Sequence, residues 1–278
     1  MNEKHYAFGK NWRSFIDAHL TDERIDEACA SLSAFTKLDR LDGKTFLDIG
    51  CGSGLFSLAA HRLGAASVVS FDVDADSVGC CRELRQREDE PASWRVLEGS
   101  ALDSDFMESL GEHDIVYSWG VLHHTGSMWE AIANVAARVR AGGLLYIAIY
   151  NRAESVGIYA DGRVGSSAFW KKEKRFYNAL PALGRRLIDV GAATGMVLAY
   201  LAMARNPLAE IRNHKTLRGM SWMVDIRDWL GGHPYEYASV DEIFTFVHER
   251  FGYTLANLTS TDTLRNNEFL FTRSARPE

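Results

Sequence analysis

The chain carries a glycine-rich segment that could hold a small charged ligand. The segment reads Asp48-Ile-Gly-Cys-Gly-Ser-Gly54 and directly follows a short apolar stretch. Gly50, Gly52 and Gly54 have no Cβ, so a ligand can approach the backbone N–H groups of this turn closely. Residues 55–63 then show helical spacing, and the N-terminus of a helix favours a negative group such as a carboxylate.

Two acidic residues narrow the choice of ligand. Asp48, two residues before the first glycine, would repel a pyrophosphate and attract an ammonium group. Asp72 ends the next apolar stretch, where it can accept hydrogen bonds from two ribose hydroxyls. A dinucleotide site would need a glycine at the position of Leu55. S-adenosylmethionine, which has a carboxylate, an ammonium group and a ribose, therefore fits better than a dinucleotide; a purely structural glycine turn is the third interpretation.

Strands that alternate with helices must position these residues. Hydrophobic spacing predicts strands at 45–49, 67–72, 94–97, 114–119 and 144–149, and helices at 21–35, 55–63, 77–87 and 129–139. The predicted fold class is α/β, a Rossmann-like doubly wound and mostly parallel sheet with a helical insertion after the fifth strand. Ligands bind such sheets beyond the carboxyl ends of the strands, where the glycine-rich turn lies.

The alternation stops after Ile149 and resumes late in the chain, which suggests four segments. We expect an N-terminal helical lid (1–40), a Rossmann-like ligand-binding core (41–152), a helical and loop substrate insertion (153–236), and a C-terminal helix with strands that complete the sheet (237–278). The insertion should lie over the mouth of the sheet.

The order of these motifs resembles that of class I S-adenosylmethionine-dependent methyltransferases. The resemblance rests on the Asp48–Gly54 segment, on Phe71-Asp72-Val73 and on Ala141-Gly142-Gly143 before an apolar strand, and covers roughly residues 40–152. Val121-Leu-His-His124 is similar to the small-molecule branch that includes the ubiquinone-biosynthesis O-methyltransferases. The resemblance makes S-adenosyl-L-methionine the expected cofactor.

The resemblance also implies a role for each motif residue. The methionyl part of the cofactor would contact Asp48, Gly50, Gly52 and Gly54; the ribose would contact Asp72, next to Val73; the adenine would lie between Ser100, Ala101 and Leu102; and Trp119 and Gly120 would line the sulfonium side. This chain departs from the family at Ser100, where many members have an acid, so the contact to the adenine amino group should be weaker.

Two adjacent histidines, His123 and His124, could act in catalysis. Histidine titrates near neutrality, so either ring could accept the proton of an acceptor hydroxyl, and His124 is the favoured candidate. The alternatives are a structural pair that caps or supports the next helix, and a pair that orients the acceptor without proton transfer. No C-x-x-C or H-x-x-x-H spacing accompanies them, so no metal is expected.

The acceptor should be bound by the insertion, whose loops are rich in polar and aromatic residues. The predicted acceptor-binding residues are Tyr150, at the end of the fifth strand, and Arg218, Trp222, Tyr235 and Glu236. The guanidinium of Arg218 could pair with an anionic acceptor. The alternative is a small structural subdomain whose aromatic side chains fill its own core.

Two further segments have open roles. Residues 187–204 are largely apolar but contain Asp189, so a buried or lid helix is favoured over a helix that touches a membrane or an oligomer contact. Arg185 and Arg186 keep the membrane interpretation open. The N-terminal aromatic cluster Tyr6, Phe8, Trp12 and Phe15 could cover the cofactor or pack against the sheet edge.

Composition limits the choice of partner. The 278 residues carry a net charge of -6, which argues against a broad nucleic-acid-binding surface. The four cysteines form no C-x-x-C pair, and the N-terminus has no apolar signal segment, so a reducing, cytoplasmic location is expected. The expected partner is a small-molecule acceptor, without nucleic acid or stable membrane insertion, and a homo-oligomer stays open.

The leading prediction is thus an enzyme that methylates a small molecule, on oxygen rather than nitrogen, by in-line displacement. A quinone-pathway methyltransferase at a membrane surface and a non-catalytic cofactor-binding regulator are the alternatives.

Overall fold

A seven-stranded sheet forms the centre of the computed structural model, which describes residues 20–154, 165–218 and 222–275. The strands follow the order β3-β2-β1-β4-β5-β7-β6. Their bounds are β1 Thr45–Ile49, β2 Ser67–Asp72, β3 Trp94–Glu98, β4 His113–Trp119, β5 Val139–Tyr150, β6 Thr254–Thr259 and β7 Asn266–Thr272. Strands β1–β5 are parallel to one another, whereas β7 is antiparallel to both β5 and β6.

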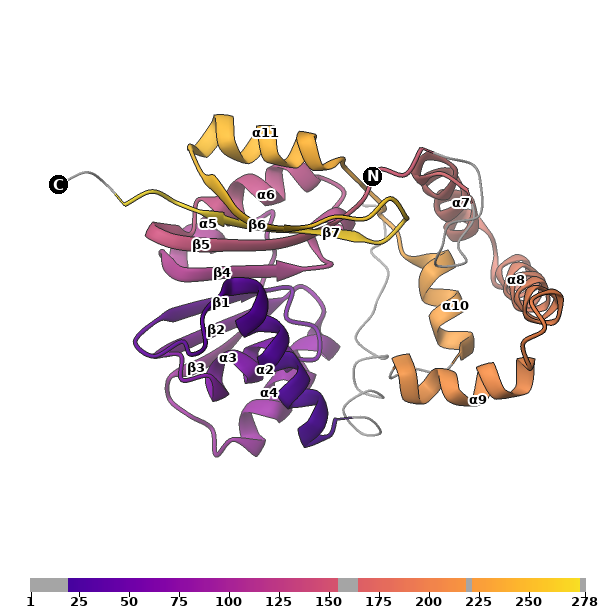
Figure 1. Cartoon of the computed structure of the whole chain (residues 1–278), viewed down its shortest axis with the longest axis horizontal. Helices are drawn as coiled ribbons and strands as arrows, with labels where there is room; N and C mark the ends of the chain where they lie inside the picture. Colours follow the sequence, from indigo (N-terminus) through magenta and orange to yellow (C-terminus); the bar gives the residue numbers. More distant parts are fainter. Residues whose placement is uncertain (1–19, 155–164, 219–221, 276–278) are drawn as a thin grey trace.

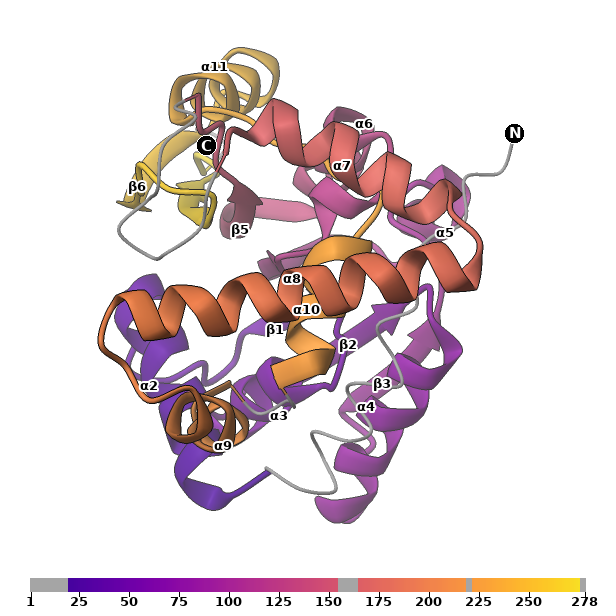
Figure 2. The ribbon, with the colours of Figure 1, turned by 90° about the vertical axis from the view of Figure 1, so that its right-hand side faces the viewer.

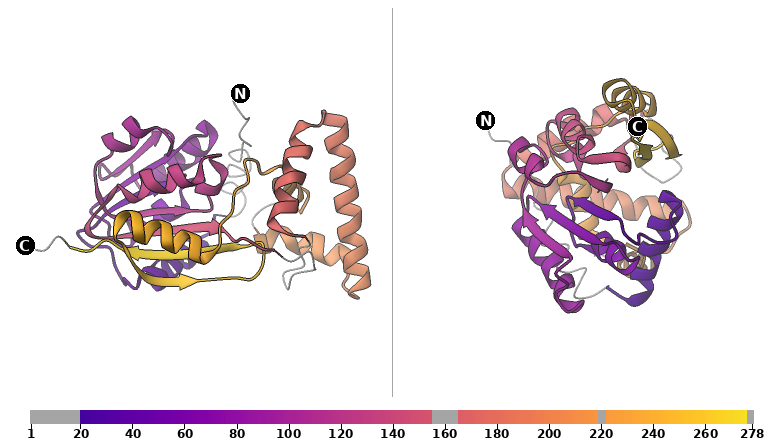
Figure 3. Two further views of the ribbon diagram at one scale, coloured as in Figure 1. Left: turned by 90° about the horizontal axis from the view of Figure 1, so that it is seen from above. Right: turned by 90° about the vertical axis from the view of Figure 1, so that its left-hand side faces the viewer.

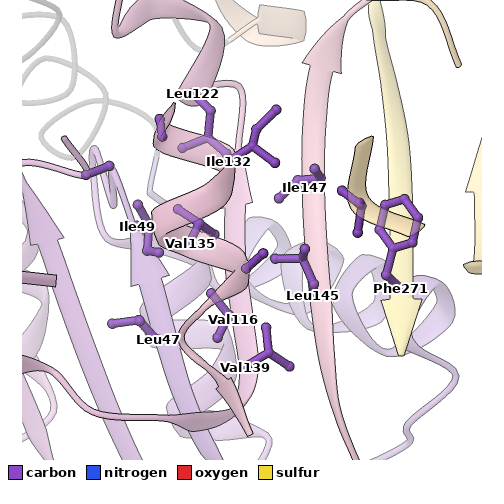
Figure 4. Packing of buried hydrophobic residues seen from close by; sticks show 14 of the residues in the cluster. Leu47, Ile49, Val116, Leu122, Ile132, Val135, Val139, Leu145, Ile147 and Phe271 are labelled. Carbon is purple, nitrogen blue, oxygen red and sulfur yellow. The ribbon is translucent and has the colours of Figure 1, made fainter. Parts of the chain in front are cut away.

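Helices cover both faces of the sheet (Figure 1). On one face lie α2 Asp22–Thr36, α3 Leu55–Arg62 and α4 Ala75–Arg87; on the other lie α5 Ser104–Ser109, α6 Met128–Ala136 and α11 Val240–Phe251. The strands alternate between the two cores: Leu47 and Val116 pack with α6, whereas Phe46 and Ile115 pack with α2 and α3. Figure 4 shows the α6 side, where Val135 contacts the sheet. The predicted Rossmann-like, mostly parallel fold is confirmed.

One boundary differs from its prediction. The sequence predicts a helix over 129–139 and a strand over 144–149, with Ala141-Gly142-Gly143 between them, but α6 ends at Ala136 and β5 already begins at Val139. Val139 pairs with His113 on β4, and an irregularity in that pairing lies between His113 and Ile115. The glycines therefore lie inside an irregular strand rather than at a helix end.

The helical insertion after the fifth strand is also confirmed. It contains α7 Ser167–Ala179, α8 Ala182–Ala202, α9 Pro207–Arg218 and α10 Trp222–Gly231, which form a separate layer beside the carboxyl ends of the parallel strands (Figure 1). Figure 3 shows this layer from above, and Figure 2 shows α8 crossing its outer side.

The insertion has a small core of its own. Tyr177, Trp222, Ile226 and Leu230 are buried together, and the carboxylate of Asp189 accepts hydrogen bonds from Tyr177 Oη at 2.7 Å and Arg227 Nε at 3.0 Å. Within the three described ranges, no helix is long and apolar enough to cross a membrane.

The N-terminal segment is described only from Leu20 onward. Its helix α2 packs on the sheet, where Phe35 stacks on Tyr146 with ring centroids 4.3 Å apart. The predicted aromatic cluster of residues 6–15 lies outside the described residues, so its lid role stays a prediction.

A substitution at Gly54 tests how closely the end of the glycine-rich turn packs against Cys81. Its φ is +85°, and a Cβ there would lie 2.9 Å from the backbone Cα of Cys81. We expect Gly54→Ala to lower the free energy of unfolding by about 2–4 kcal/mol, because a left-handed backbone and a backbone clash both oppose the methyl group.

Gly111→Ala is the matched control, since Gly111 has φ +76° but nothing within 4 Å of the position that a methyl group would take. It should lose only about 1–2 kcal/mol in the same denaturant titration. Equal losses for the two variants would show that the contact with Cys81 is unimportant.

Candidate functional site

A cavity of about 420 Å³ lies at the carboxyl ends of β1, β2, β4 and β5. It brings together most of the predicted cofactor residues, namely Asp48, Gly50, Gly52, Asp72, Val73, Ser100, Ala101, Leu102, Trp119 and Gly120, with His124 and Tyr150 from the predicted catalytic and acceptor sets. These residues come from five separate segments of the sequence. The sheet order places the cavity at the switch point between β1 and β4, where α/β folds bind ligands.

The glycine-rich turn is fastened to the end of β2. The N–H groups of Gly50 and Cys51 both donate to the carbonyl oxygen of Phe71 at 2.9 Å. Gly50 has φ +71°, and a Cβ there would lie 2.4 Å from Val121, so only glycine fits. Gly54 does not line the cavity; it begins α3 behind the turn.

Asp48 is a buried carboxylate at the cavity wall. Its Oδ2 accepts a hydrogen bond from Ser57 Oγ at 2.5 Å, and only 2% of the residue is exposed. Burial raises the pKa of Asp48 to about 7, the Ser57 hydroxyl opposes this rise, and the negative charge of Asp72 adds to it. An ammonium group in the cavity would stabilise the charged form.

Asp72 orders the loop as well as facing the cavity. Its Oδ2 accepts the N–H of Gly52 at 3.0 Å and its Oδ1 that of Asp74 at 2.9 Å. Burial raises the pKa of Asp72, and these two N–H groups oppose the rise. Each carboxylate oxygen has a second lone pair, so Asp72 can also accept hydrogen bonds from a diol.

Part of the cavity rim is apolar. Val73 and Trp119 line it although they are 62% and 44% exposed, so a ligand there would remove apolar surface from water. Ser100 Oγ accepts the N–H of Leu102 at 3.2 Å, which orders the turn that follows β3.

The structure separates the two histidines. His124 lines the cavity, and its Nδ1 is 2.7 Å from the carbonyl oxygen of Pro234. Because a carbonyl only accepts, Nδ1 carries the proton, and Nε2 is the nitrogen that can accept one.

His123 is fully buried and does not line the cavity. Its Nδ1 accepts the backbone N–H of Tyr150 at 3.2 Å, which fixes the opposite tautomer. Burial, and then the neighbouring His124, hold the pKa of His123 well below its usual value, so the ring is neutral. A proton-accepting role in the cavity therefore fits His124 and not His123.

Several predicted acceptor residues lie away from the cavity lining. Trp222 fills the core of the insertion, where its Nε1 is 3.4 Å from Tyr200 Oη. Tyr235 is buried beside Tyr150, with ring centroids 5.1 Å apart. These positions differ from the expected acceptor wall, and for Trp222 they match the alternative of a structural subdomain.

Glu236 and Arg218 complete that set. Glu236 Oε2 accepts the N–H of Met128 at 2.9 Å and so caps α6. Its own N–H donates to the carbonyl oxygen of His123 at 2.9 Å. Arg218 ends α9, and its side chain lies outside the described part of the chain, so its contact with an acceptor stays a prediction.

Sequence reasoning missed several polar residues of the cavity wall, among them Asp74, Tyr117 and His233. Tyr117 Oη is buried and has no hydrogen-bond partner among the described residues. A buried hydroxyl without a partner is costly, and a bound ligand could satisfy it. Tyr117 could have been predicted from the sequence, because it lies near the carboxyl end of β4. His233 could not, because it comes from the insertion and its position depends on how the insertion folds.

No group of three or more His, Cys, Asp or Glu residues in the described ranges is arranged to hold a metal ion.

Comparison with known proteins relates part of this chain to methyltransferases. Residues 47–147 match the family model described as Methyltransferase domain. A ubiquinone biosynthesis O-methyltransferase of Rhizobium etli is 34% identical over 140 residues, which cover 49% of this chain and 54% of that protein. A second one, from Brucella ovis, is 25% identical over 201 residues, covering 72% of this chain and 79% of that protein.

A solved structure shares the fold. Magnesium protoporphyrin IX methyltransferase of Synechocystis PCC 6803, solved with bound S-adenosylhomocysteine, superposes with a TM-score of 0.53 at 15% identity, covering 95% of this chain and 94% of that chain. The chain spans only about half the length of the Rhizobium etli relative that it matches. Residues 47–147 nevertheless match a methyltransferase domain, and this part of the chain is similar to the ubiquinone-type enzymes, in agreement with the resemblance of its motifs.

Proposed function

We propose that this chain transfers the methyl group of S-adenosylmethionine to a small-molecule acceptor, with oxygen as the receiving atom. The observation that carries the proposal is one cavity that holds Asp48, the glycine-rich turn, Asp72 and His124. The similarity to methyltransferases named for O-methylation supports the choice of oxygen.

The residues of the cavity fit the groups of this cofactor. Asp48 would bind the ammonium group, the N-terminus of α3 the carboxylate, and Asp72 the ribose hydroxyls. Val73, Ala101 and Leu102 would flank the adenine. When bound, S-adenosylmethionine supplies a methyl group activated by the adjacent sulfonium.

His124 would act on the acceptor. Its Nε2 accepts the proton of the acceptor hydroxyl, while its Nδ1–H stays bonded to Pro234 O and keeps the ring oriented. The oxygen would then be held for in-line displacement at the methyl group, so orientation would supply much of the rate. The bond from oxygen to the methyl carbon would form as the bond to sulfur breaks, with S-adenosylhomocysteine as the leaving group.

Four free cysteines, three of them buried, support a reducing compartment such as the cytoplasm. We expect no nucleic-acid partner, and a second copy of the chain stays a possible partner.

The ribose assignment is tested with Asp72→Ala. Losing two charge-assisted hydrogen bonds should weaken S-adenosylhomocysteine binding roughly 30-fold or more in calorimetric titration. Asp103→Ala is the matched control: Asp103 caps α5 by accepting the N–H of Phe106 at 3.0 Å and does not line the cavity. It should bind within a few-fold of the unaltered protein. Unchanged affinity of the Asp72 variant would exclude the ribose contact.

The catalytic role is tested with His124→Gln and labelled methyl transfer to a panel of phenols, catechols and small carboxylic acids. We expect turnover to fall about 10²–10⁴-fold while S-adenosylhomocysteine affinity stays within a few-fold. His248→Gln is the control, because its Nδ1 also bonds a backbone carbonyl, that of Tyr253 at 2.9 Å, but outside the cavity. Full turnover in the His124 variant would refute the role of His124 as the proton acceptor. If the unaltered protein binds the cofactor but methylates no compound of the panel, the non-catalytic regulator becomes the better interpretation.

A membrane-surface methyltransferase, in a quinone pathway, remains a second candidate because of the outer side of α8. Leu183, Leu187, Val190, Leu198 and Leu201 are 58–71% exposed and follow a helical spacing that forms one stripe. The insertion also exposes basic side chains, at Lys171, Lys172, Arg175, Arg185, Arg186 and Arg212. The acids described in residues 165–218 are all partly or fully buried, so this side would attract anionic lipid.

Co-sedimentation tests this second candidate. The protein should bind vesicles that contain phosphatidylglycerol, bind phosphatidylcholine vesicles weakly, and be released by salt. A triple variant, Leu183→Gln with Leu187→Gln and Val190→Gln, should lose most binding. The control is Phe244→Gln with Leu258→Gln, which changes two exposed apolar residues on α11 and β6. This control variant should keep its vesicle binding. Equal loss in both variants would exclude α8 as the contact surface.

A further inference from the structure

A chain of buried hydrogen bonds runs behind Asp48. Trp94 Nε1 donates to Ser70 Oγ at 2.9 Å, the hydroxyls of Ser70 and Ser57 are 2.6 Å apart, and Ser57 Oγ donates to Asp48 Oδ2 at 2.5 Å. Ser57, Ser70 and Trp94 are fully buried, and none of the three lines the cavity.

When Asp48 is charged, the direction of every bond in this hydrogen-bond chain is fixed. The indole N–H of Trp94 can only donate, so Ser70 Oγ accepts from it. Ser57 uses its single proton on Asp48, so the remaining bond must run from the Ser70 hydroxyl to Ser57 Oγ. All three protons therefore point toward the carboxylate, and aligned bonds of this kind strengthen one another.

The four residues come from four different elements. Asp48 lies on β1, Ser57 on α3, Ser70 on β2 and Trp94 on β3. The parallel pairing sets Asp48 opposite Ser70 and Ser70 opposite Val96. The chain can thus form only when three strands and the helix after the glycine-rich turn are in place.

We propose that Ser57, Ser70 and Trp94 are positioning residues that hold Asp48 as a charged acceptor at the cavity wall for the ammonium group of the ligand's amino-acid part. The proposal deepens the proposed function and rests on it. Ser57 bonds Asp48 directly, whereas Ser70 and Trp94 act through Ser57.

The other groups that face Asp48 do not provide a compensating positive charge. Asp72 on β2 is negative, and it disfavours the Asp48 carboxylate. Cys51 in the turn and Tyr117 on β4 are neutral, because hydrogen bonding with Cys81 and burial raise the pKa of Cys51, and burial raises that of Tyr117, well above their ordinary values. The backbone N–H of Ser57, the hydrogen-bond chain through its side chain and the ligand's ammonium group are left to stabilise the charge.

Protonation of Asp48 should make the ligand affinity depend on pH. The pKa of Asp48 is about 7, so lowering the pH through 7 protonates the carboxyl and removes the partner of the ammonium group. Affinity for an amino-acid-bearing ligand should then fall as the pH drops. Loss of a donor in the chain should raise this midpoint.

The experiment compares two probes between pH 5.5 and 8.5. S-adenosylhomocysteine carries the ammonium group, whereas 5′-methylthioadenosine has the same adenosine and sulfur but no amino-acid part. Their affinity ratio reports Asp48, because any titration of Asp72 affects both probes. In the unaltered protein the ratio should fall through a midpoint near 7 as the pH is lowered.

Substitutions in the hydrogen-bond chain should raise the pH at the midpoint of the affinity ratio. We expect a shift of roughly one to two pH units for Ser57→Ala, which removes a hydrogen bond to a charged group, and smaller shifts for Ser70→Ala and Trp94→Phe. Ser118→Ala is the control, since Ser118 is equally buried but donates to the carbonyl oxygen of Ile49 at 3.0 Å. It should keep the midpoint even where it lowers the melting temperature.

The outcomes separate this inference from the proposed function. If neither probe binds the unaltered protein, the proposed function fails and this inference falls with it. If S-adenosylhomocysteine binds but the affinity ratio keeps one midpoint in all variants, only the hydrogen-bond chain is refuted. Should Ser70→Ala fail to fold, Trp94→Phe and a carbon-13 NMR titration of Asp48 in the folded variants decide the matter in the same way.

Discussion

The register between β1 and β2 is the constraint on which the site depends. The pairing places Asp48 opposite Ser70 and Ile49 opposite Phe71. Phe71 O can then accept two N–H groups of the glycine-rich turn, while Asp72, the next residue, holds Gly52. A slip of one residue would turn Asp48 to the other face of the sheet and would detach the turn. Geometry at the cavity is therefore set by strand pairing inside the core.

A second link joins this core to the insertion through two adjacent histidines. His123 turns inward and accepts the N–H of Tyr150, and His124 turns to the cavity and donates to Pro234. The carbonyl oxygens of His123 and Tyr150 accept the N–H groups of Glu236 and Ala238. The end of the insertion is thus bonded to the loop after β4 and to the end of β5. A movement of the insertion would therefore change the orientation of the His124 ring.

The parts that could be predicted from sequence are those that depend on local order. Alternating apolar stretches gave the sheet, and the acid at the end of the second strand gave Asp72, because parallel strands bring their carboxyl ends to one edge. Trp222 and Glu236 could not be placed in this way. Their polar and aromatic character suits an acceptor pocket and a structural role equally, and only the packing of α7–α10 shows that Trp222 fills a core and Glu236 caps α6. Ser70 and Trp94 were unremarkable in the sequence because their partners lie on other strands.

The buried carboxylates also connect stability with ligand binding. Asp48 and Asp72 lie at one end of the sheet with raised pKa values, so each charge opposes folding near neutral pH. A ligand with an ammonium group and a ribose would supply the missing partners, and binding only to the folded state stabilises that state. Removing either aspartate would remove both the cost and the specificity. The same desolvation that disfavours the charge of Asp48 thus makes the site selective for a ligand with an ammonium group, because a ligand without one would leave that carboxylate uncompensated.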